Sequence, residues 1–292
     1  MRNQTKQHTL WLLAAASAPL AHFSGCGWLT VLLAAVTVLP LTLLPKCWEE
    51  LSRPLALIQL LWLGAVAGLL LQNSAAYWPS DNDLVVPLTL LALAAVTPKG
   101  SAPRIGAVLA FCTALLALPV AISGAAHVEP AWMPWTAGAW PWALSLVLLF
   151  PALPAAGEGR MGRKSLWVGL LAVLLALLVQ GTISPQVAGS VADPFYQTVR
   201  TLGYLEPVAA VCLTLGWYAV TGFLLHSAAV IAETADIGRK TAYVLSTGTA
   251  LLAILLKWQP KFPICMVLST ILWVSAPFLN KIKKSKKHEK RC

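Results

Sequence analysis

Long apolar stretches recur between positions 9 and 280 of the chain, and short clusters of proline, glycine and charged residues separate them. A membrane-spanning helix needs about 20 predominantly apolar residues. The pattern therefore predicts an all-α polytopic membrane protein with about ten transmembrane helices. The predicted spans are 9–23, 26–44, 54–75, 84–97, 103–125, 139–156, 165–185, 205–230, 241–257 and 261–280.

The segments between these spans are short. None is long or polar enough to fold as a separate water-soluble domain, so residues 1–280 are predicted to form a single transmembrane domain and 281–292 a basic cytoplasmic tail. The longest segment outside the spans runs from 184 to 204. Its amphipathic pattern of Phe195, Val199 and Leu202 predicts a short helix at the membrane interface.

Basic residues sort the connecting segments into two classes. Of the 21 lysines and arginines, 18 fall on one side of the predicted bilayer. The other side receives Arg200, Lys257 and Lys261, together with Asp81, Asp83, Glu129, Asp193 and Glu206. Cytoplasmic loops carry an excess of Lys and Arg, so both termini of this multi-pass protein of the cell membrane are predicted to be cytoplasmic.

Composition agrees with the span pattern. Hydrophobic residues make up 58% of the chain and charged residues 11%, whereas about a quarter of a soluble domain is charged. A net charge of +10 can indicate nucleic-acid binding, but seven of the basic residues lie between Lys281 and Arg291. We therefore expect no nucleic-acid partner, and expect this tail to lie against anionic lipid.

No catalytic signature is present. The sequence lacks HExxH, GxSxG, a P-loop and a GxGxxG after a strand, which predicts that the protein is not an enzyme and has no catalytic residues. The six cysteines, at 26, 47, 112, 212, 265 and 292, show no CxxC pair or regular spacing, so no metal site, cofactor or disulfide framework is expected. The apolar run that ends at Cys26 also fits a lipoprotein signal, as an alternative to a retained first helix.

Few polar groups fall inside the spans. His22 and His226 are the ionisable ones at bilayer depth, and each is either a functional group or a histidine with an ordinary hydrogen bond. Gln59 and Gln180 either join two helices or contact a ligand.

Two predicted spans carry helix-breaking residues. The first contains Pro19 and ends in Ser24-Gly25-Cys26-Gly27, and the sixth contains Pro151 and Pro154. Proline removes an intrahelical hydrogen bond and glycine tolerates non-helical torsions, so both segments are candidates for broken helices. Breaks at positions one and six of ten predict a five-plus-five inverted repeat with a central substrate site. Ordinary proline kinks are the alternative.

Several stretches resemble the B subunit of the spore germinant receptors, a branch of the amino acid/polyamine/organocation transporter superfamily. Residues 193–207 read DPFYQTVRTLGYLEP, and Gly216-Trp217-Tyr218 follow in the next apolar run. Family members similarly place a Phe-Tyr-x-x-Val-Arg-x-Leu segment and a glutamate before their eighth helix. Further similar stretches are Leu57–Trp62, Pro87–Ala94, Lys99-Gly100 and the Phe150–Pro154 break.

The resemblance implies a ten-helix permease fold in the spore inner membrane, germinant receptor A and C subunits as partners, and the binding or sensing of a small zwitterionic nutrient such as an amino acid. A conventional secondary amino-acid transporter and a degenerate membrane scaffold without transport are the alternatives. With the paired breaks, it predicts a ligand site formed by Ser24, Gly25, Gln59, Trp62, Phe150, Pro151 and Tyr218. Backbone amides there would hold the ligand carboxylate, and carbonyls with the Tyr218 hydroxyl would take the amine.

Overall fold

A computed structural model of the chain describes residues 53–78, 82–97, 102–125, 193–203 and 205–258, with isolated positions between 174 and 191. All regular elements within these residues are helices, and the described residues contain no strand. The elements are α3 (Arg53–Gln72), the 3-10 helix η2 (Asn73–Tyr77), α4 (Val85–Val96), α5 (Ala102–Ala125), α10 (Pro194–Thr201), α11 (Glu206–Thr234) and α12 (Arg239–Leu255).

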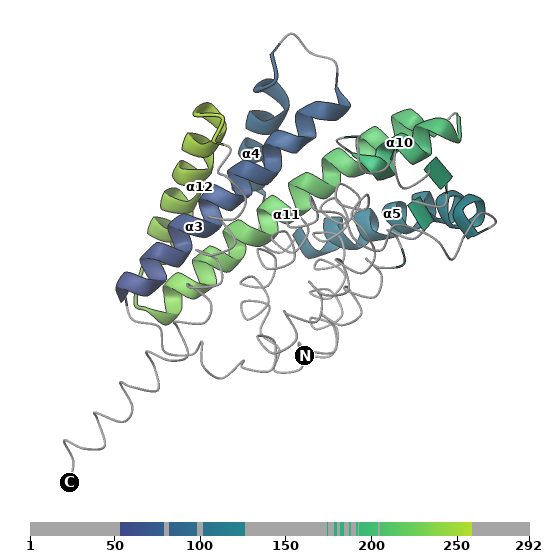
Figure 1. Ribbon diagram of the computed structural model, residues 1–292. Helices are drawn as coiled ribbons and strands as arrows, with labels where there is room; N and C mark the ends of the chain where they lie inside the picture. The colour runs from purple at the N-terminus through teal and green to yellow at the C-terminus, as the bar shows by residue number, and fades with distance from the viewer. Residues whose placement is uncertain are drawn as a thin grey trace, which may run out of the picture.

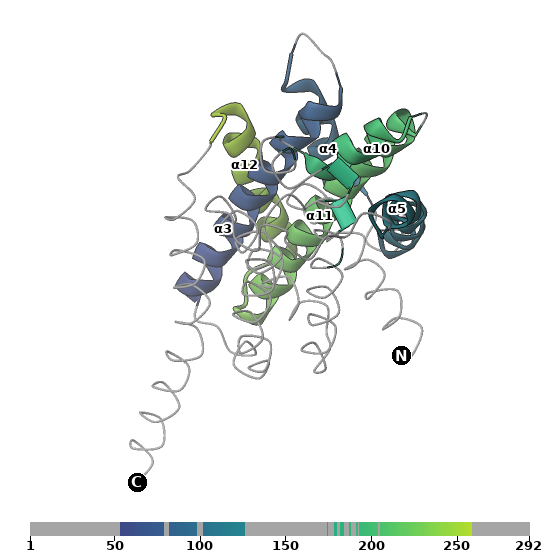
Figure 2. The same ribbon diagram turned by 45° about the vertical axis from the view of Figure 1, so that its right-hand side comes forward.

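The long helix α11 lies at the centre of this arrangement. It packs against α3, α4, α5, α10, α12 and η2. Helices α3 and α12 lie side by side on one flank of α11, while α5 lies on the other, and α10 covers the end of α11 at which that helix begins (Figures 1 and 2). The core is built largely by α11, whose Trp217, Phe223 and Leu224 are completely buried.

The ends of α11 and α12 follow from local chemistry. Pro207 occupies the first turn of α11, where its missing amide costs no hydrogen bond. At the other end Asp236 adopts a left-handed conformation with φ of 56°, and the Ile237 amide donates to the Ala232 carbonyl at 2.9 Å. This is a Schellman motif, which satisfies carbonyls left open where a helix stops. The end of α12 repeats it, with Lys257 at φ 45°.

Helices α3 and α12 meet through small residues. Gly64 and Gly68, one turn apart on α3, lie against the backbone of Ser246 and Ala250 on α12. A Cβ added to Gly64 would lie 2.9 Å from the Ser246 Cα, and closer still to the Ser246 carbonyl oxygen, so only glycine allows this approach. We call Gly64, Gly68, Ser246 and Ala250 the glycine seam. Close backbone approach through such residues is a common way for membrane helices to associate, since lipid provides no hydrophobic drive between them.

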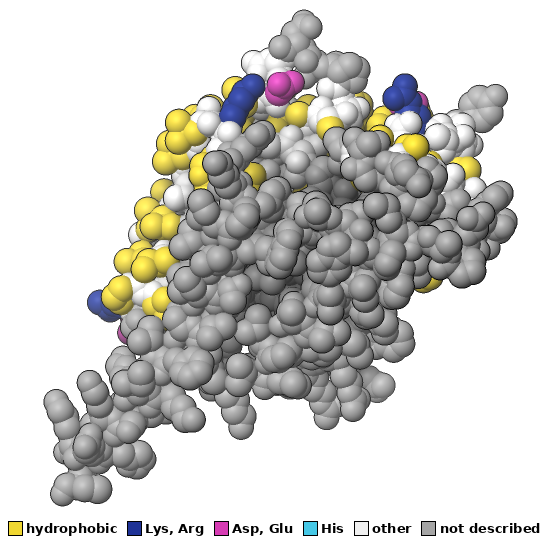
Figure 3. All heavy atoms as spheres, in the orientation of Figure 1, with side chains coloured by type: hydrophobic (Ala, Val, Ile, Leu, Met, Phe, Trp, Pro, Cys, Tyr) yellow, Lys and Arg dark blue, Asp and Glu magenta, His cyan; other side chains and the backbone are white. Residues whose placement is uncertain are grey.

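A band of apolar side chains is exposed over α3 and α12. It includes Ile58, Leu61, Val244, Leu252 and Leu256. Figure 3 shows that hydrophobic side chains cover this flank and that charged ones gather at its two ends. An ion pair of Arg239 with Glu233 marks the start of α12, and Lys257 with Asp83, 3.6 Å apart, marks its end. The 17 residues of α12 separate these pairs by about 25 Å.

An exposed apolar surface of this kind marks contact with a membrane or another protein. Two helical segments, Arg53–Tyr77 and Glu206–Glu233, are long and apolar enough to cross a membrane by length and composition. Helix α4 is apolar but shorter. The chain therefore has the elements that membrane association requires, in agreement with the prediction from hydropathy.

The described helices coincide with predicted spans. Helices α3, α4, α5, α11 and α12 occupy the predicted ranges 54–75, 84–97, 103–125, 205–230 and 241–257. The described residues within 165–185 are also helical. The ranges 9–23, 26–44, 139–156 and 261–280 and the tail 281–292 lie outside the described residues. The all-helical class is thus confirmed for the described residues, while the count of ten and the inverted repeat stay predictions.

Candidate functional site

Three of the seven residues predicted to bind a ligand are described. Gln59 and Trp62 lie on α3 and Tyr218 on α11. Gln59 is buried, with 3% of its surface exposed. Trp62 meets Trp258 edge to face, with ring centroids 6.1 Å apart, whereas Tyr218 contacts Thr97 at the end of α4. Trp62 and Tyr218 thus contact different residues, although their helices, α3 and α11, pack against each other. Ser24, Gly25, Phe150 and Pro151 lie outside the described residues.

Tyr218 shares a hydrogen bond with the end of α4. Its phenolic oxygen lies 2.5 Å from the Thr97 hydroxyl. We call Thr97 and Tyr218 the hydroxyl cluster. Tyr218 is partly buried, and the two hydroxyl groups lie among apolar helices, where polar groups are costly unless they find partners.

The hydrogen-bond directions in the cluster can be worked out. The Thr97 hydroxyl donates to the Leu93 carbonyl at 2.6 Å. A hydroxyl has one proton, so Tyr218 must be the donor in its bond with Thr97. The lone pairs of the Tyr218 oxygen then remain as acceptors. The cluster can therefore accept a hydrogen bond from a cationic or neutral donor at this point.

Helix α4 ends at this cluster because of its sequence. Thr97 is extended, with φ of −61° and ψ of 124°, and the residue that follows is Pro98. A residue before proline is disfavoured in the helical region, so the helix stops at Val96. With 12 residues, α4 is about 18 Å long, less than the roughly 30 Å of bilayer hydrocarbon. The predicted span 84–97 is therefore a short helix that ends beside the middle of α11.

A second group of polar side chains lies where the start of α10 meets η2 and α11. The Tyr77 hydroxyl donates to the Asp193 carboxylate, and the Trp217 indole donates to the Tyr77 oxygen at 3.2 Å. Asp193 also caps α10, since its other oxygen accepts from the Tyr196 amide at 3.0 Å. Asp193 is only 7% exposed. A buried carboxylate needs such donors, so this junction fixes the start of α10 on the helix bundle.

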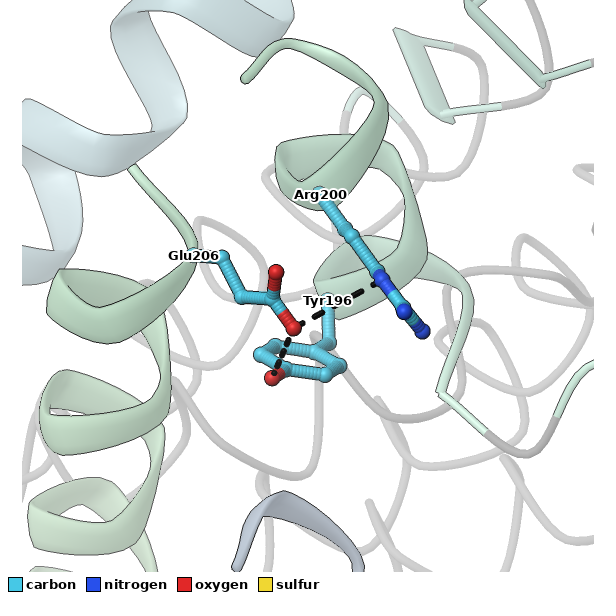
Figure 4. A network of polar contacts seen from close by, with 3 residues as sticks. All are labelled: Tyr196, Arg200 and Glu206. Carbon is cyan, nitrogen blue, oxygen red and sulfur yellow. Dashed lines mark hydrogen bonds and ion pairs between the residues drawn. The ribbon is translucent and has the colours of Figure 1, made fainter. Parts of the chain in front are cut away.

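The other side of α10 is attached to the first turn of α11. The Tyr196 hydroxyl donates to Glu206 at 3.0 Å, and the same carboxylate oxygen lies 3.5 Å from the Arg200 guanidinium (Figure 4). Burial raises the pKa of the Tyr196 phenol above its ordinary value, and the hydrogen bond to Glu206 raises it further. Phe195 and Val199 are buried in the core, so protein contacts hold the apolar face of α10. The short helix that the sequence predicted is therefore present, and its position at a membrane interface stays a prediction.

Sequence reasoning missed parts of this arrangement. The signal for the glycine seam was present, since Gly64 and Gly68 form a GxxxG pattern within an apolar stretch. The bond between Tyr77 and Asp193 had no such signal, because 116 positions separate the two residues. The Thr221 hydroxyl of α11 finds its partner within the helix, where it donates to the Trp217 carbonyl at 2.9 Å.

The hydroxyl cluster is built from neutral groups, whereas the attachment of α10 also uses the carboxylates of Asp193 and Glu206. Within the described residues, no group of three or more His, Cys, Asp or Glu side chains is placed to hold a metal ion. The hydroxyl cluster can exchange hydrogen bonds with a small polar ligand, and the junction around Asp193 holds elements of the fold together. No protein-family model matches the chain, and a comparison with curated proteins found no match.

Proposed function

We propose that the chain is a multi-pass membrane protein of the permease type that binds or senses a small zwitterionic nutrient such as an amino acid. The observation that carries the proposal is the Tyr218 hydroxyl, which donates to Thr97 and keeps its lone pairs as acceptors. Such an oxygen can take a ligand ammonium group. Buried Gln59, on the neighbouring helix α3, adds a second neutral polar group to the bundle.

The proposal includes a topology. The Arg53 guanidinium donates to the Ala235 carbonyl at 3.3 Å, so the basic start of α3 and the turn between α11 and α12 share one end of the bundle. Lys257 and Asp83 pair at the opposite end. This arrangement supports the division of the connecting segments into two classes, one on each side of the membrane. The proposed cytoplasmic position of both termini depends on that division. Ten spans in a five-plus-five repeat, over a single domain 1–280 with a lipid-bound tail 281–292, complete this part of the proposal.

The resemblance to germinant receptor B subunits supplies the finer assignment. In that assignment the protein resides in a spore inner membrane, acts beside A and C subunits, and passes on the signal of a bound nutrient without enzymatic activity. Ser24, Gly25, Phe150 and Pro151 would complete the ligand site around Tyr218. Two alternative functions differ in what happens to the ligand. A conventional amino-acid transporter would bind the ligand at the same site and carry it across the membrane, whereas a scaffold subunit would not bind it.

Ligand-dependent thermal stability tests the proposal. The full chain in lipid nanodiscs is melted with each of the common L-amino acids, and a binding amino acid should raise the Tm, because a ligand stabilises only the state that it enters. Tyr218→Phe should weaken this ligand at least tenfold. Tyr196→Phe, which removes a hydroxyl outside the hydroxyl cluster, serves as the matched control and should leave the affinity unchanged.

Two results would count against this assignment. If no amino acid stabilises the parent protein, the scaffold alternative gains support. If an amino acid binds but Tyr218→Phe and Gly25→Trp both bind it as tightly as the parent, the site lies elsewhere. Uptake of the same amino acid into proteoliposomes then separates a transporter from a sensor.

A further inference from the structure

The apolar band over α3 and α12 is built from large aliphatic side chains, which we call the aliphatic stripe. Its members are Val244, Leu245, Leu251, Leu252, Leu255 and Leu256 on α12, and Leu57, Ile58 and Leu61 on α3. On α12 the pairs 244–245, 251–252 and 255–256 are seven and four residues apart, so they share one side of the helix. Val244 and Leu256 are 72% and 74% exposed, so this stripe lies on the surface of the protein.

The small residues of α12 lie on the side that faces α3. Ala242, Ser246 and Ala250 are completely buried, and the glycine seam brings the α3 backbone against the last two. Membrane helices associate through small residues that let backbones approach, because lipid tails are as apolar as leucine. The side of α12 that suits a helix partner is therefore already used within the fold, and its bulky side chains are left on the outside.

The stripe on α12 nearly matches the thickness of bilayer hydrocarbon. Between Lys240 and Lys257 the sequence contains no charged residue. The 16 residues 241–256 rise about 24 Å, against roughly 30 Å of hydrocarbon, and long lysine side chains can reach the headgroups from a helix end. Within this length the Thr249 hydroxyl donates to the Leu245 carbonyl at 3.0 Å. A hydroxyl bonded to its own helix needs no water, as a position in hydrocarbon requires.

The two ends of the stripe differ in charge. The end at which α12 starts has more cations than carboxylates, with Arg53, Arg239 and Lys240 against Glu233 and Asp236. At the opposite end one lysine pairs with one aspartate. Cytoplasmic leaflets are anionic and attract basic segments. The charge balance thus complements phosphate headgroups at the start of α12, which is the cytoplasmic end in the proposed topology.

We propose that the aliphatic stripe is a lipid-contacting face of the protein, covered by acyl chains along its length and by anionic headgroups at its cationic end. This assignment rests on the membrane placement within the proposed function, but not on ligand binding. It goes further by fixing which flank of the bundle forms part of the perimeter. Any second copy or partner subunit then docks on another surface.

Spin-label accessibility tests the assignment on the full chain. Val244→Cys, Leu252→Cys and Leu256→Cys are made in a cysteine-free background, labelled with a nitroxide and placed in nanodiscs of phosphatidylcholine and phosphatidylglycerol. Oxygen concentrates in hydrocarbon, whereas a polar nickel chelate stays in water. The oxygen-to-nickel collision ratio at 244 and 252 should exceed that of an Asp83→Cys control about tenfold. The label at 256, beside Lys257, should give an intermediate ratio. Because these side chains are exposed, the Tm should stay that of the unlabelled background.

Two results would overturn the assignment. Low collision rates with both reagents at 244 and 252 would show that protein covers the stripe. Spin–spin broadening that disappears on dilution with unlabelled protein would identify that protein as a second copy. High nickel collision at both positions would show that the stripe faces water.

Flotation with liposomes separates these failures from failure of the proposed function. A chain that floats while its stripe faces water or protein is in the membrane and presents a different flank to lipid, so only the present assignment fails. A chain that does not float contradicts the membrane placement of the proposed function as well.

Discussion

Alanine in place of Gly64 should weaken the packing of α3 against α12. In Gly64→Ala the new methyl group would lie 2.9 Å from the Ser246 Cα, whereas ordinary contact begins near 3.4 Å. The atoms that it meets include backbone, which cannot rotate away. Helices α3 and α12 therefore have to separate by about 0.5 Å or more, and a gap of about 0.5–1 Å forfeits a quarter to a half of each dispersion contact. Overpacking of this kind costs about 1–3 kcal/mol.

Gly68→Ala should behave in the same way, since its methyl group would lie 2.9 Å from the Ala253 Cβ and closer to the Ala250 carbonyl oxygen. Gly222 and Gly248 provide matched controls. They are also helical glycines, but an added Cβ would meet nothing within 4 Å. Alanine at these two positions should be neutral or stabilising by about 0.5–1 kcal/mol, because it lowers the entropy cost of helix formation.

The assay is thermal unfolding in nanodiscs, followed by tryptophan fluorescence. The chain has 13 tryptophans, and Trp62 and Trp258 lie on α3 and just beyond α12. We expect Gly64→Ala and Gly68→Ala to lower the Tm by roughly 2–6 °C, and the two controls to leave it unchanged or raise it. If all four variants melt alike, the close approach of the two backbones is wrong.

Two further predictions concern the attachment of α10. Tyr77→Phe removes the hydroxyl that accepts from buried Trp217 and donates to Asp193, so it should destabilise the protein by about 1–3 kcal/mol, measured as a lower Tm. Tyr196→Phe removes a less buried hydrogen bond and should cost less than about 1 kcal/mol. Equal losses of stability in the two variants would contradict this ranking by burial. The raised pKa of Tyr196 means that its contribution is complete below the ordinary tyrosine pKa of about 10 and is lost as the pH rises through the higher folded-state value. The Tm difference between the parent and Tyr196→Phe should therefore be constant from pH 7 to about 9 and shrink above pH 10, and a difference that grows at high pH would refute this sign.

The sequence determined the features that depend on near neighbours in the chain. Apolar runs predicted helices at the places where α3, α5 and α11 are found, because backbone groups in an apolar setting must bond within the helix. Pro98 and Pro207 mark the end of one helix and the start of another. The short helix before α11 was also predictable, since Asp193-Pro194 caps and begins it.

Tertiary structure alone decided which distant groups meet. Tyr218 was predicted as a ligand residue, but its partner Thr97 lies 121 positions away, and no local pattern joins them. The same holds for Tyr77 and Asp193, which are hydrogen-bonded although 116 positions separate them. Such contacts depend on which helices pack together and on how each helix is rotated about its axis. The pattern of apolar runs is compatible with several packing arrangements and does not select one of them. Gly64 and Gly68 are the exception, because their GxxxG spacing in the sequence already indicates a closely packed neighbouring helix. The close approach of the α12 backbone excludes a side chain at both positions.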